Sequence, residues 1–143
     1  MSTLTRSDGT QFVIQAYREL LATTKRALLL QEIRLLAEQQ GQYVYLTRKD
    51  PDHIEAVFAR EPGCLLGESV WQYFGMPENL IFCEALPSST HVLVVVVRNN
   101  SVYLDAKILN GSLRSELVPL MTENNRYTIF TSGDVSLCDK ANS

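Results

Sequence analysis

The strongest candidates for acid–base chemistry are two carboxylates, Glu84 and Asp105. Each lies in a segment that reads as a β-strand, residues 80–85 and residues 101–109. Carboxylates that converge from neighbouring strands can share a proton or hold metal ions. The two strands are candidates to be neighbours, but no motif makes these side chains face each other, and acids on a solvated strand face are the commoner interpretation. A small cytosolic, hydrolase-like enzyme using these strand carboxylates is therefore an alternative hypothesis for function.

The histidines and cysteines form no recognisable catalytic or metal-binding pattern. His53 lies in a turn and His91 precedes a buried strand, and neither belongs to a His-Glu-x-x-His or Gly-x-Ser-x-Gly motif. The cysteines are odd in number and lack a Cys-x-x-Cys spacing, which predicts reduced thiols in a cytosolic setting: Cys64, Cys83 and Cys138. We therefore expect no catalytic residue and no metal.

A hairpin over residues 92–105 is the only place suggestive of nucleotide chemistry. Paired strands of this kind bind phosphate in actin-like and ribonuclease-H-like folds, where glycines let the backbone approach the phosphate. Here the tip is Asn99-Asn100, without glycine, and neither Gly-x-Gly-x-x-Gly nor a Walker A sequence occurs in the chain. We therefore predict no nucleotide or other cofactor.

A group of three aromatic residues and one methionine follows Gly67, on a segment with helical spacing. Its members are Trp71, Tyr73, Phe74 and Met76. Aromatic residues and methionine are enriched at protein interfaces, which makes these four the candidate protein-interaction residues. Val70, Trp71 and Phe74 share one helical face, the typical pattern of core residues, so Tyr73 on the opposite side is the best candidate for an exposed contact.

Charge and hydropathy exclude several classes of function. The net charge is −3, from 13 basic and 16 acidic residues, and no basic cluster of the kind that binds nucleic acid is present. Residues 1–9 are polar and lack the apolar region of a signal peptide. The most apolar run, residues 92–97, is far shorter than the roughly 20 residues of a membrane span. We expect membrane attachment only through a segment outside this chain.

The strands and helices that carry these residues are predicted most clearly in the second half of the chain. Strands are predicted over residues 80–85, 91–98, 101–109 and 127–131, with two-residue turns at Asn99-Asn100 and Asn110-Gly111. Helices are predicted over residues 67–74 and 112–121, the latter with Pro119 near its end. The β-branched run in residues 91–98 predicts a strand buried on both faces.

The first half begins with a polar leader, residues 1–10, which contains an Asp8-Gly9 turn. Residues 12–14 form a short apolar patch, a strand or a docking segment. Residues 16–22 either extend the following helix or form a separate turn. That helix covers residues 24–40, with Leu29, Ile33 and Leu36 on its apolar stripe, which Leu28, Leu30 and Ala37 widen.

Two strands follow that helix, and a tail ends the chain. Residues 43–47 predict a strand, and residues 53–59 a returning strand rather than a short helix. The whole pattern predicts a mixed α/β fold: one small domain over residues 11–137, with a hairpin-containing mixed sheet packed by helices, followed by a polar tail over residues 138–143.

Four segments together resemble a known family. They are Pro-Gly-Cys-Leu-Leu-Gly-Glu-Ser-Val-Trp-Gln-Tyr-Phe-Gly at 62–75 with Leu-Ile-Phe-Cys-Glu-Ala-Leu-Pro at 80–87, the hairpin 94–105, and the final strand from Tyr127 to Val135. They are similar to the cytoplasmic N-terminal domain of inner-membrane proteins of type IVb pilus assembly, the pilin accessory proteins of the bundle-forming-pilus C type, related in role to the L component of type II secretion. The resemblance covers roughly residues 10–137, and its motifs are structural.

The resemblance implies a degenerate actin-like or ribonuclease-H-like lobe that has lost nucleotide binding. It implies a non-enzymatic scaffold or adaptor at the cytoplasmic face of a bacterial inner membrane, ahead of a single membrane-spanning helix. The implied partners are the hexameric assembly ATPase and neighbouring platform proteins of a pilus or secretion apparatus. A free cytosolic chaperone or adaptor remains a further alternative, since such proteins are also small, acidic and α/β.

Overall fold

The computed structural model describes residues 2–121 and 126–135 and confirms the mixed α/β class. The chain divides into two compact units, Met1–Leu65 and Leu66–Ser143. The prediction that residues 11–137 form one domain stays a prediction. Cys138 and the predicted polar tail lie outside the described residues.

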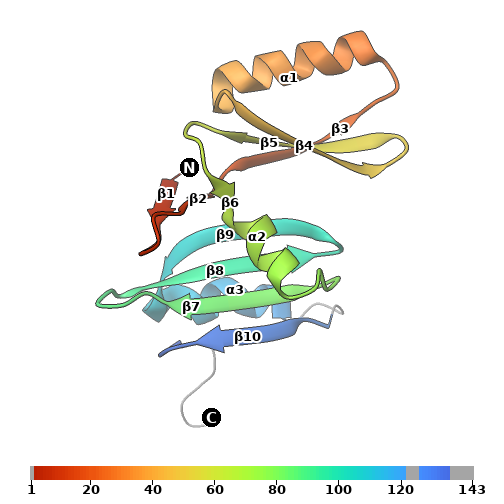
Figure 1. The fold of residues 1–143 in the computed structure, drawn as a ribbon. Helices are drawn as coiled ribbons and strands as arrows, with labels where there is room; N and C mark the ends of the chain where they lie inside the picture. Colours follow the sequence, from red (N-terminus) through yellow and green to blue (C-terminus); the bar gives the residue numbers. More distant parts are fainter. Residues whose placement is uncertain (1, 122–125, 136–143) are drawn as a thin grey trace. The chain divides into compact units, whose positions relative to one another are not determined.

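The first unit contains two three-stranded sheets and one helix (Figure 1). One sheet has the order β1-β2-β6 and the other β3-β5-β4. The elements are β1 (Ser2–Thr5), β2 (Gln11–Ile14), β3 (Tyr17–Ala22), α1 (Arg26–Gln40), β4 (Tyr43–Asp50), β5 (His53–Ala59) and β6 (Cys64–Leu65). The patch at residues 12–14 is thus a strand, and residues 53–59 form the predicted returning strand.

Helix α1 covers one face of the β3-β5-β4 sheet. Its side chains Leu29, Ile33, Leu36 and Ala37 pack on a cluster whose buried members are Leu21, Ile54, Ala56 and Phe58. The predicted stripe is therefore confirmed at its centre, but Leu28 and Leu30, expected to widen it, are exposed. A single sheet face is narrower than the arc that these leucines cover around the helix.

Two further predictions for the first unit were wrong. Residues 17–22 form strand β3, paired antiparallel with β5, and neither extend the helix nor form a turn. Strand β1 lies within the leader and pairs antiparallel with β2, around the predicted Asp8-Gly9 turn. That turn is closed by the Asp8 carboxylate, which accepts a hydrogen bond from the Thr10 N–H at 2.9 Å.

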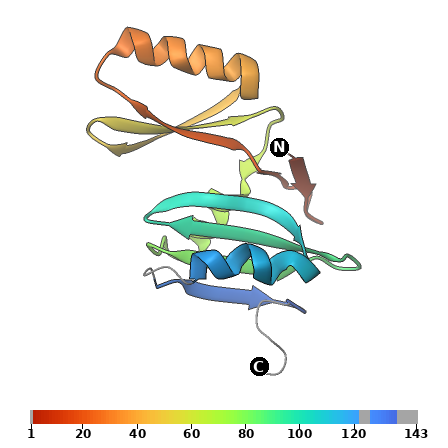
Figure 2. The ribbon, with the colours of Figure 1, turned by 180° about the vertical axis from the view of Figure 1, so that it is seen from behind.

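The second unit is a four-stranded sheet in the order β10-β7-β8-β9 with a helix on each face (Figures 1 and 2). Strand β8 runs antiparallel to both of its neighbours, β7 and β9, and β10 runs parallel to β7. The elements are α2 (Leu66–Tyr73), β7 (Leu80–Ala85), β8 (His91–Arg98), β9 (Ser101–Leu109), a 3₁₀ turn (Asn110–Ser112), α3 (Leu113–Met121) and β10 (Thr128–Ser132).

Strand β8 forms the centre of this unit, as the β-branched run predicted. All six residues from Val92 to Val97 are buried. Their even-numbered side chains pack with Leu113, Leu117 and Leu120 of α3. The odd-numbered side chains therefore face the α2 side, because successive side chains on a strand alternate between faces. The Asn99-Asn100 turn has φ of 52° and 64°, the left-handed region that a two-residue hairpin of this type requires.

Candidate protein-interaction surface

Helix α2 and strand β10 together carry the main exposed aromatic surface of the second unit. Helix α2 ends in a Schellman motif: the Gly75 N–H donates to Gln72 O at 3.1 Å and the Met76 N–H donates to Trp71 O at 2.9 Å. Gly75 has φ of 82°, which glycine adopts without cost, and Pro77 follows. The sequence therefore ends the helix immediately after its aromatic residues.

Four rings from three elements form what we call the aromatic cluster: Tyr73, Phe74, Phe82 and Phe130. Phe74 stacks on Phe130 with centroids 4.1 Å apart and an interplanar angle of 17°. It also meets Phe82 at 5.6 Å and, edge to face, Tyr73 at 5.1 Å. Offset stacks and edge-to-face pairs of this kind contribute about 0.5–1.5 kcal/mol each beyond area burial.

The predicted interaction residues divide between core and surface. Trp71 is buried, and its indole N–H donates to Pro77 O at 2.8 Å, so its role is to hold the helix end. Tyr73 is 83% exposed and Met76 51% exposed, as the helical spacing indicated for Tyr73. Phe74 is half-buried in the aromatic cluster.

Sequence reasoning missed Phe82 and Phe130 as members of this surface. They are directly paired in the parallel β10–β7 register. A signal was present: both strands carry Ile-Phe followed by a small residue, at 81–83 and 129–131. Only the pairing of two segments far apart in sequence brings the rings together.

The carboxylates Glu84 and Asp105 are not on neighbouring strands, which corrects that expectation. Glu84 is opposite Leu93 and Asp105 is opposite Val95, so strand β8 separates the two acids. Two strand spacings, together with the two-residue offset along the strands, place their Cα atoms roughly 11–12 Å apart. The side-by-side geometry on which the carboxylate-pair hypothesis depended is absent.

Asp105 instead connects the sheet to α2. It is 2% exposed, and its Oδ2 accepts a hydrogen bond from the Gly67 N–H at 3.4 Å. Gly67 is the second residue of α2, where backbone N–H groups have no partner within the helix. A carboxylate at this position satisfies one of them and interacts favourably with the helix dipole. A Cβ on Gly67 would lie 2.6 Å from Val102 Cγ1, so glycine allows this close approach.

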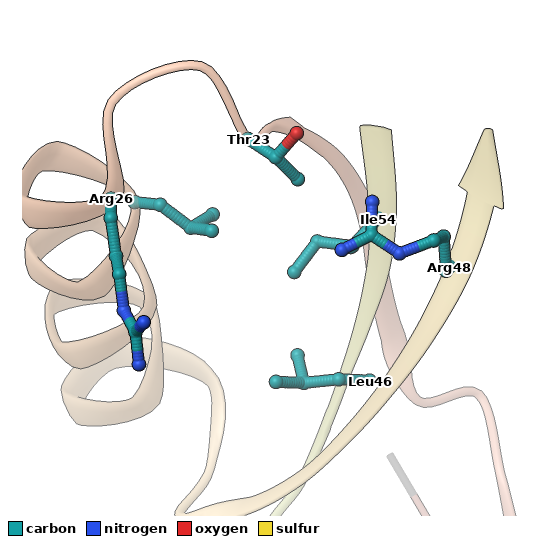
Figure 3. Close-up of a pocket in the computed structure, with 6 residues that line it drawn as sticks. Thr23, Arg26, Leu46, Arg48 and Ile54 are labelled. Carbon is teal, nitrogen blue, oxygen red and sulfur yellow. The ribbon is translucent and has the colours of Figure 1, made fainter. Parts of the chain in front are cut away.

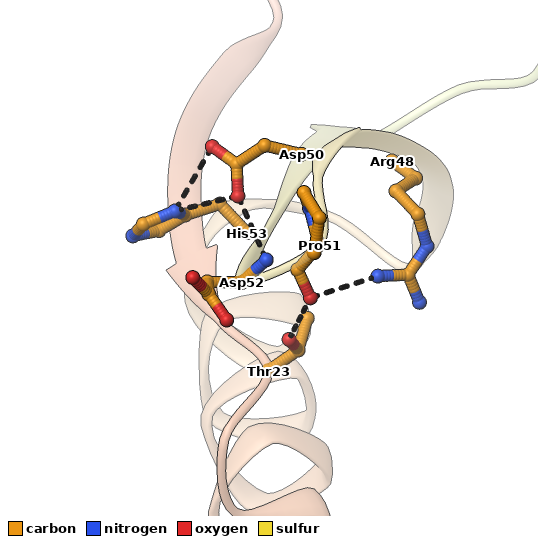
Figure 4. Close-up of polar contacts among 6 residues, drawn as sticks. All are labelled: Thr23, Arg48, Asp50, Pro51, Asp52 and His53. Atoms are coloured by element: carbon orange, nitrogen blue, oxygen red, sulfur yellow. Dashed lines mark hydrogen bonds and ion pairs between the residues drawn. The ribbon is translucent and has the colours of Figure 1, made fainter.

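His53 lies at the β4–β5 turn of the first unit, where polar contacts hold it (Figure 4). Its Nδ1 is 3.0 Å from Asp50 Oδ1, which also accepts a hydrogen bond from the Asp52 N–H at 2.8 Å. These two contacts lower the pKa of Asp50, the backbone bond being the larger cause. Thr23 Oγ1 and Arg48 Nη1 both donate to Pro51 O, at 3.2 and 3.3 Å. These contacts stabilise the β4–β5 turn.

A hollow of about 400 Å³ opens between α1 and the β3-β5-β4 sheet (Figure 3). Its floor is aliphatic, and two arginines, Arg26 on α1 and Arg48 on β4, stand on opposite walls. The lining residues are Thr23, Arg26, Leu29, Leu46, Arg48 and Ile54. Chemically, the hollow suits an apolar group that carries a negative charge.

The cysteine thiols differ in environment. Cys83 lies in the core of the second unit, and burial raises its pKa to about 11. Cys64 on β6 is exposed. Within residues 2–121 and 126–135, no group of three or more His, Cys, Asp or Glu side chains is arranged to hold a metal ion. In the same part of the chain, no helix is both long and apolar enough to span a membrane.

No family model, curated protein or solved structure matches this chain.

Proposed function

We propose that this chain is a non-enzymatic scaffold or adaptor domain of an inner-membrane pilus or secretion assembly platform. It binds the cytoplasmic assembly ATPase or a neighbouring platform protein at the cytoplasmic face of a bacterial inner membrane. The observation that carries the proposal is the aromatic cluster, with Tyr73 83% exposed at its rim. Tyrosine is one of the residue types enriched among the side chains that carry most of the binding energy at protein interfaces.

The β8–β9 hairpin of the second unit bears on the actin-like or ribonuclease-H-like lobe that the family resemblance implies. Strand β8 pairs antiparallel with β7 and β9, and β10 runs parallel to β7. The β8–β9 turn, where such lobes approach phosphate, carries Asn99 and Asn100 instead of glycine, in keeping with a lobe that binds protein rather than nucleotide.

The role of Asp105 also favours the scaffold over the hydrolase-like alternative. The Asp105 carboxylate is buried and occupied with the N-terminus of α2, the helix that presents Tyr73. Asp105 therefore acts as a positioning residue for the interaction surface. A free cytosolic chaperone would use the same surface, so the identity of the partner distinguishes a platform scaffold from a free chaperone.

The test is a calorimetric titration of the full chain against the hexameric assembly ATPase of the same apparatus. We expect micromolar or tighter binding without ATP turnover by this chain. Tyr73→Ala should weaken the affinity about tenfold or more, as expected for an interface anchor. The matched control is Tyr103→Ala, since Tyr103 is 57% exposed at the opposite edge of the same sheet.

Three outcomes would count against the proposal. Absence of binding at millimolar concentrations would remove the ATPase as partner, and the titration would then be repeated with the platform proteins. Equal losses from Tyr73→Ala and Tyr103→Ala would show that the aromatic cluster is not the contact. ATP hydrolysis by the chain alone would contradict the non-enzymatic assignment.

A further inference from the structure

Strand β10 is an unpaired edge of the second unit's sheet. Among the described strands it pairs only with β7, and all five of its residues are exposed. Figures 1 and 2 both show it as the outermost strand on its side of the sheet. Such an edge presents a row of backbone donors and acceptors to a further strand.

The register determines which backbone groups face outward. The Thr128 N–H donates to Asn79 O at 3.0 Å, so the backbone of Thr128 faces β7. Backbone groups alternate in direction along a strand, so Phe130 and Ser132 also face β7. The N–H and C=O groups of Ile129 and Thr131 therefore face the open edge.

This edge lacks the features that protect the opposite edge of the same sheet and both edges of the β3-β5-β4 sheet. Protein edges are commonly guarded by charged side chains or bulges. Strand β9, at the opposite side of the same sheet, carries an exposed Lys107 and a register shift against β8. In the first unit, edge strand β3 contains Arg18 and Glu19, while β4 contains three charged residues and a register shift. Strand β10 reads Thr-Ile-Phe-Thr-Ser, without charge or bulge.

We propose that β10 pairs with the β10 strand of a second copy of this chain. The pairing is antiparallel about a two-fold axis, with Phe130 opposite Phe130. Ile129 of one copy then exchanges backbone hydrogen bonds with Thr131 of the other, which uses every outward-facing group of the strand. Thr128 lies opposite Ser132, so all five residues are paired.

The side chains favour this register over its neighbours. Phe130 opposite Phe130 is a non-hydrogen-bonded pair, in which side chains come closest, and aromatic cross-strand pairs stabilise sheets. Because each Phe130 already stacks on Phe74, the two aromatic clusters become one surface. No like charges meet along the strand. Other two-fold registers, with the paired strands shifted relative to each other, would place Phe130 opposite Thr128 or Ser132 and leave strand residues unpaired.

Disulfide trapping tests the register in a background with Cys64→Ser, Cys83→Ala and Cys138→Ser. Phe130→Cys places two thiols on Cα atoms about 4.5 Å apart, within the range for a disulfide. We expect oxidation to give a covalent dimer. Thr128→Cys alone is the matched control, because its two copies lie roughly 13–14 Å apart in this register. An equimolar mixture of Thr128→Cys and Ser132→Cys chains should cross-link to each other.

Light scattering during gel filtration tests the dimer without cysteines. The wild-type chain should approach twice the 16.1 kDa of one chain as concentration rises. Phe130→Lys places two like charges across the axis and should raise the dimer dissociation constant at least tenfold, with folding checked by circular dichroism. Leu109→Lys adds the same charge to the opposite edge strand, where Leu109 is 50% exposed, and should leave the constant unchanged.

Two results would overturn the proposal. A mass of one chain at millimolar concentration, together with no Phe130→Cys cross-link, would exclude pairing of this edge. Cross-linking of Thr128→Cys alone as fast as Phe130→Cys would exclude the register. Neither measurement contains the ATPase, so failure here leaves the proposed adaptor function to its own titration.

Discussion

The two larger sheets of this chain are built differently. In the β3-β5-β4 sheet, helix α1 lies on one face and has no buried residue, with Leu28, Leu30 and Leu35 about half exposed. In the β10-β7-β8-β9 sheet, each face carries a helix, and β8 is buried along six consecutive residues. Helices α2 and α3 each have three buried residues. In the β3-β5-β4 sheet, the face opposite α1 packs on β2 and β6, where Val57 and Ala59 contact Val13 and Leu65, and α1 itself remains partly exposed to solvent.

The edges of the two sheets differ in the opposite sense. The less buried sheet is protected at both edges by charge, while the better buried sheet has one charge-free edge at β10. The same uncharged strand contributes Phe130 to the aromatic cluster. The second unit therefore combines the more deeply buried core with the surface best suited to binding.

The largest expected effect is in the core of the second unit. Leu117 on α3 is fully buried, so Leu117→Ala should lower the free energy of unfolding by about 2–5 kcal/mol through lost burial and a residual cavity. The matched change on α1 is Leu30→Ala, at a side chain 53% exposed, with an effect within about 0.5 kcal/mol. Urea unfolding followed by circular dichroism measures both. Similar losses of unfolding free energy from the two variants would contradict the difference in burial between the two sheets.

A smaller effect is expected where α2 approaches the sheet. Gly67→Ala places a Cβ 2.6 Å from Val102 Cγ1 and should cost about 1–3 kcal/mol as α2 moves away. It should also weaken binding to the partner, because Tyr73 lies on the same helix. Gly111→Ala is the control, since no atom lies within 4 Å of a Cβ there. Thermal unfolding curves that coincide for the two variants would contradict this packing account.

The next effect is expected at the β8–β9 turn. Asn100 has φ of 64°, so Asn100→Ala should lower the free energy of unfolding by about 1–2 kcal/mol because a Cβ is strained there. Asn100→Gly, which tolerates positive φ, should lower it less than Asn100→Ala. Chemical denaturation at pH 7 compares the two. Equal losses for glycine and alanine would show that the Asn100 side chain, and not its backbone conformation, stabilises the turn.

The smallest effect concerns pH at the β4–β5 turn of the first unit. The pKa of Asp50 is lowered below its ordinary value of 3.8 by the Asp52 N–H and by His53. A carboxylate with a lowered folded-state pKa contributes stability above its unfolded pKa and loses it as pH falls through the folded value. The small advantage of the native chain over Asp50→Asn should therefore be present at pH 6 and shrink below pH 3.8. Paired melts from pH 2 to 6 measure it, and an advantage that grows on acidification would contradict the assignment.

The sequence predicted the elements well where period and turn chemistry agree. Strands β7, β8 and β9 have the predicted bounds, because each alternating or β-branched run ends at a turn residue. Strand β3 was missed because residues 17–22 contain helix-favouring Arg, Glu, Leu and Ala, and pairing with β5 overrides that preference. Strand β1 was missed because a short polar segment has no hydrophobic period, and its partner β2 alone specifies it.

The candidate surface was predicted only in part for a similar reason. Helical spacing along 67–74 is a local property, so it correctly placed Trp71 inside and Tyr73 outside. The contribution of Phe130 depends on the parallel register between β10 and β7, which joins segments about fifty residues apart in sequence. No local pattern specifies that register.

Local sequence patterns specify the α/β class, the buried central strand, the Asn-Asn hairpin and the end of α2 at Gly75. Each depends on side-chain period or backbone conformational freedom, which act within a few residues. The tertiary structure alone decided that Asp105 serves α2 and not a partner carboxylate. It alone placed β10 at an open, uncharged edge beside Phe74. These outcomes depend on strand order, which is set by the packing of distant segments against a shared core.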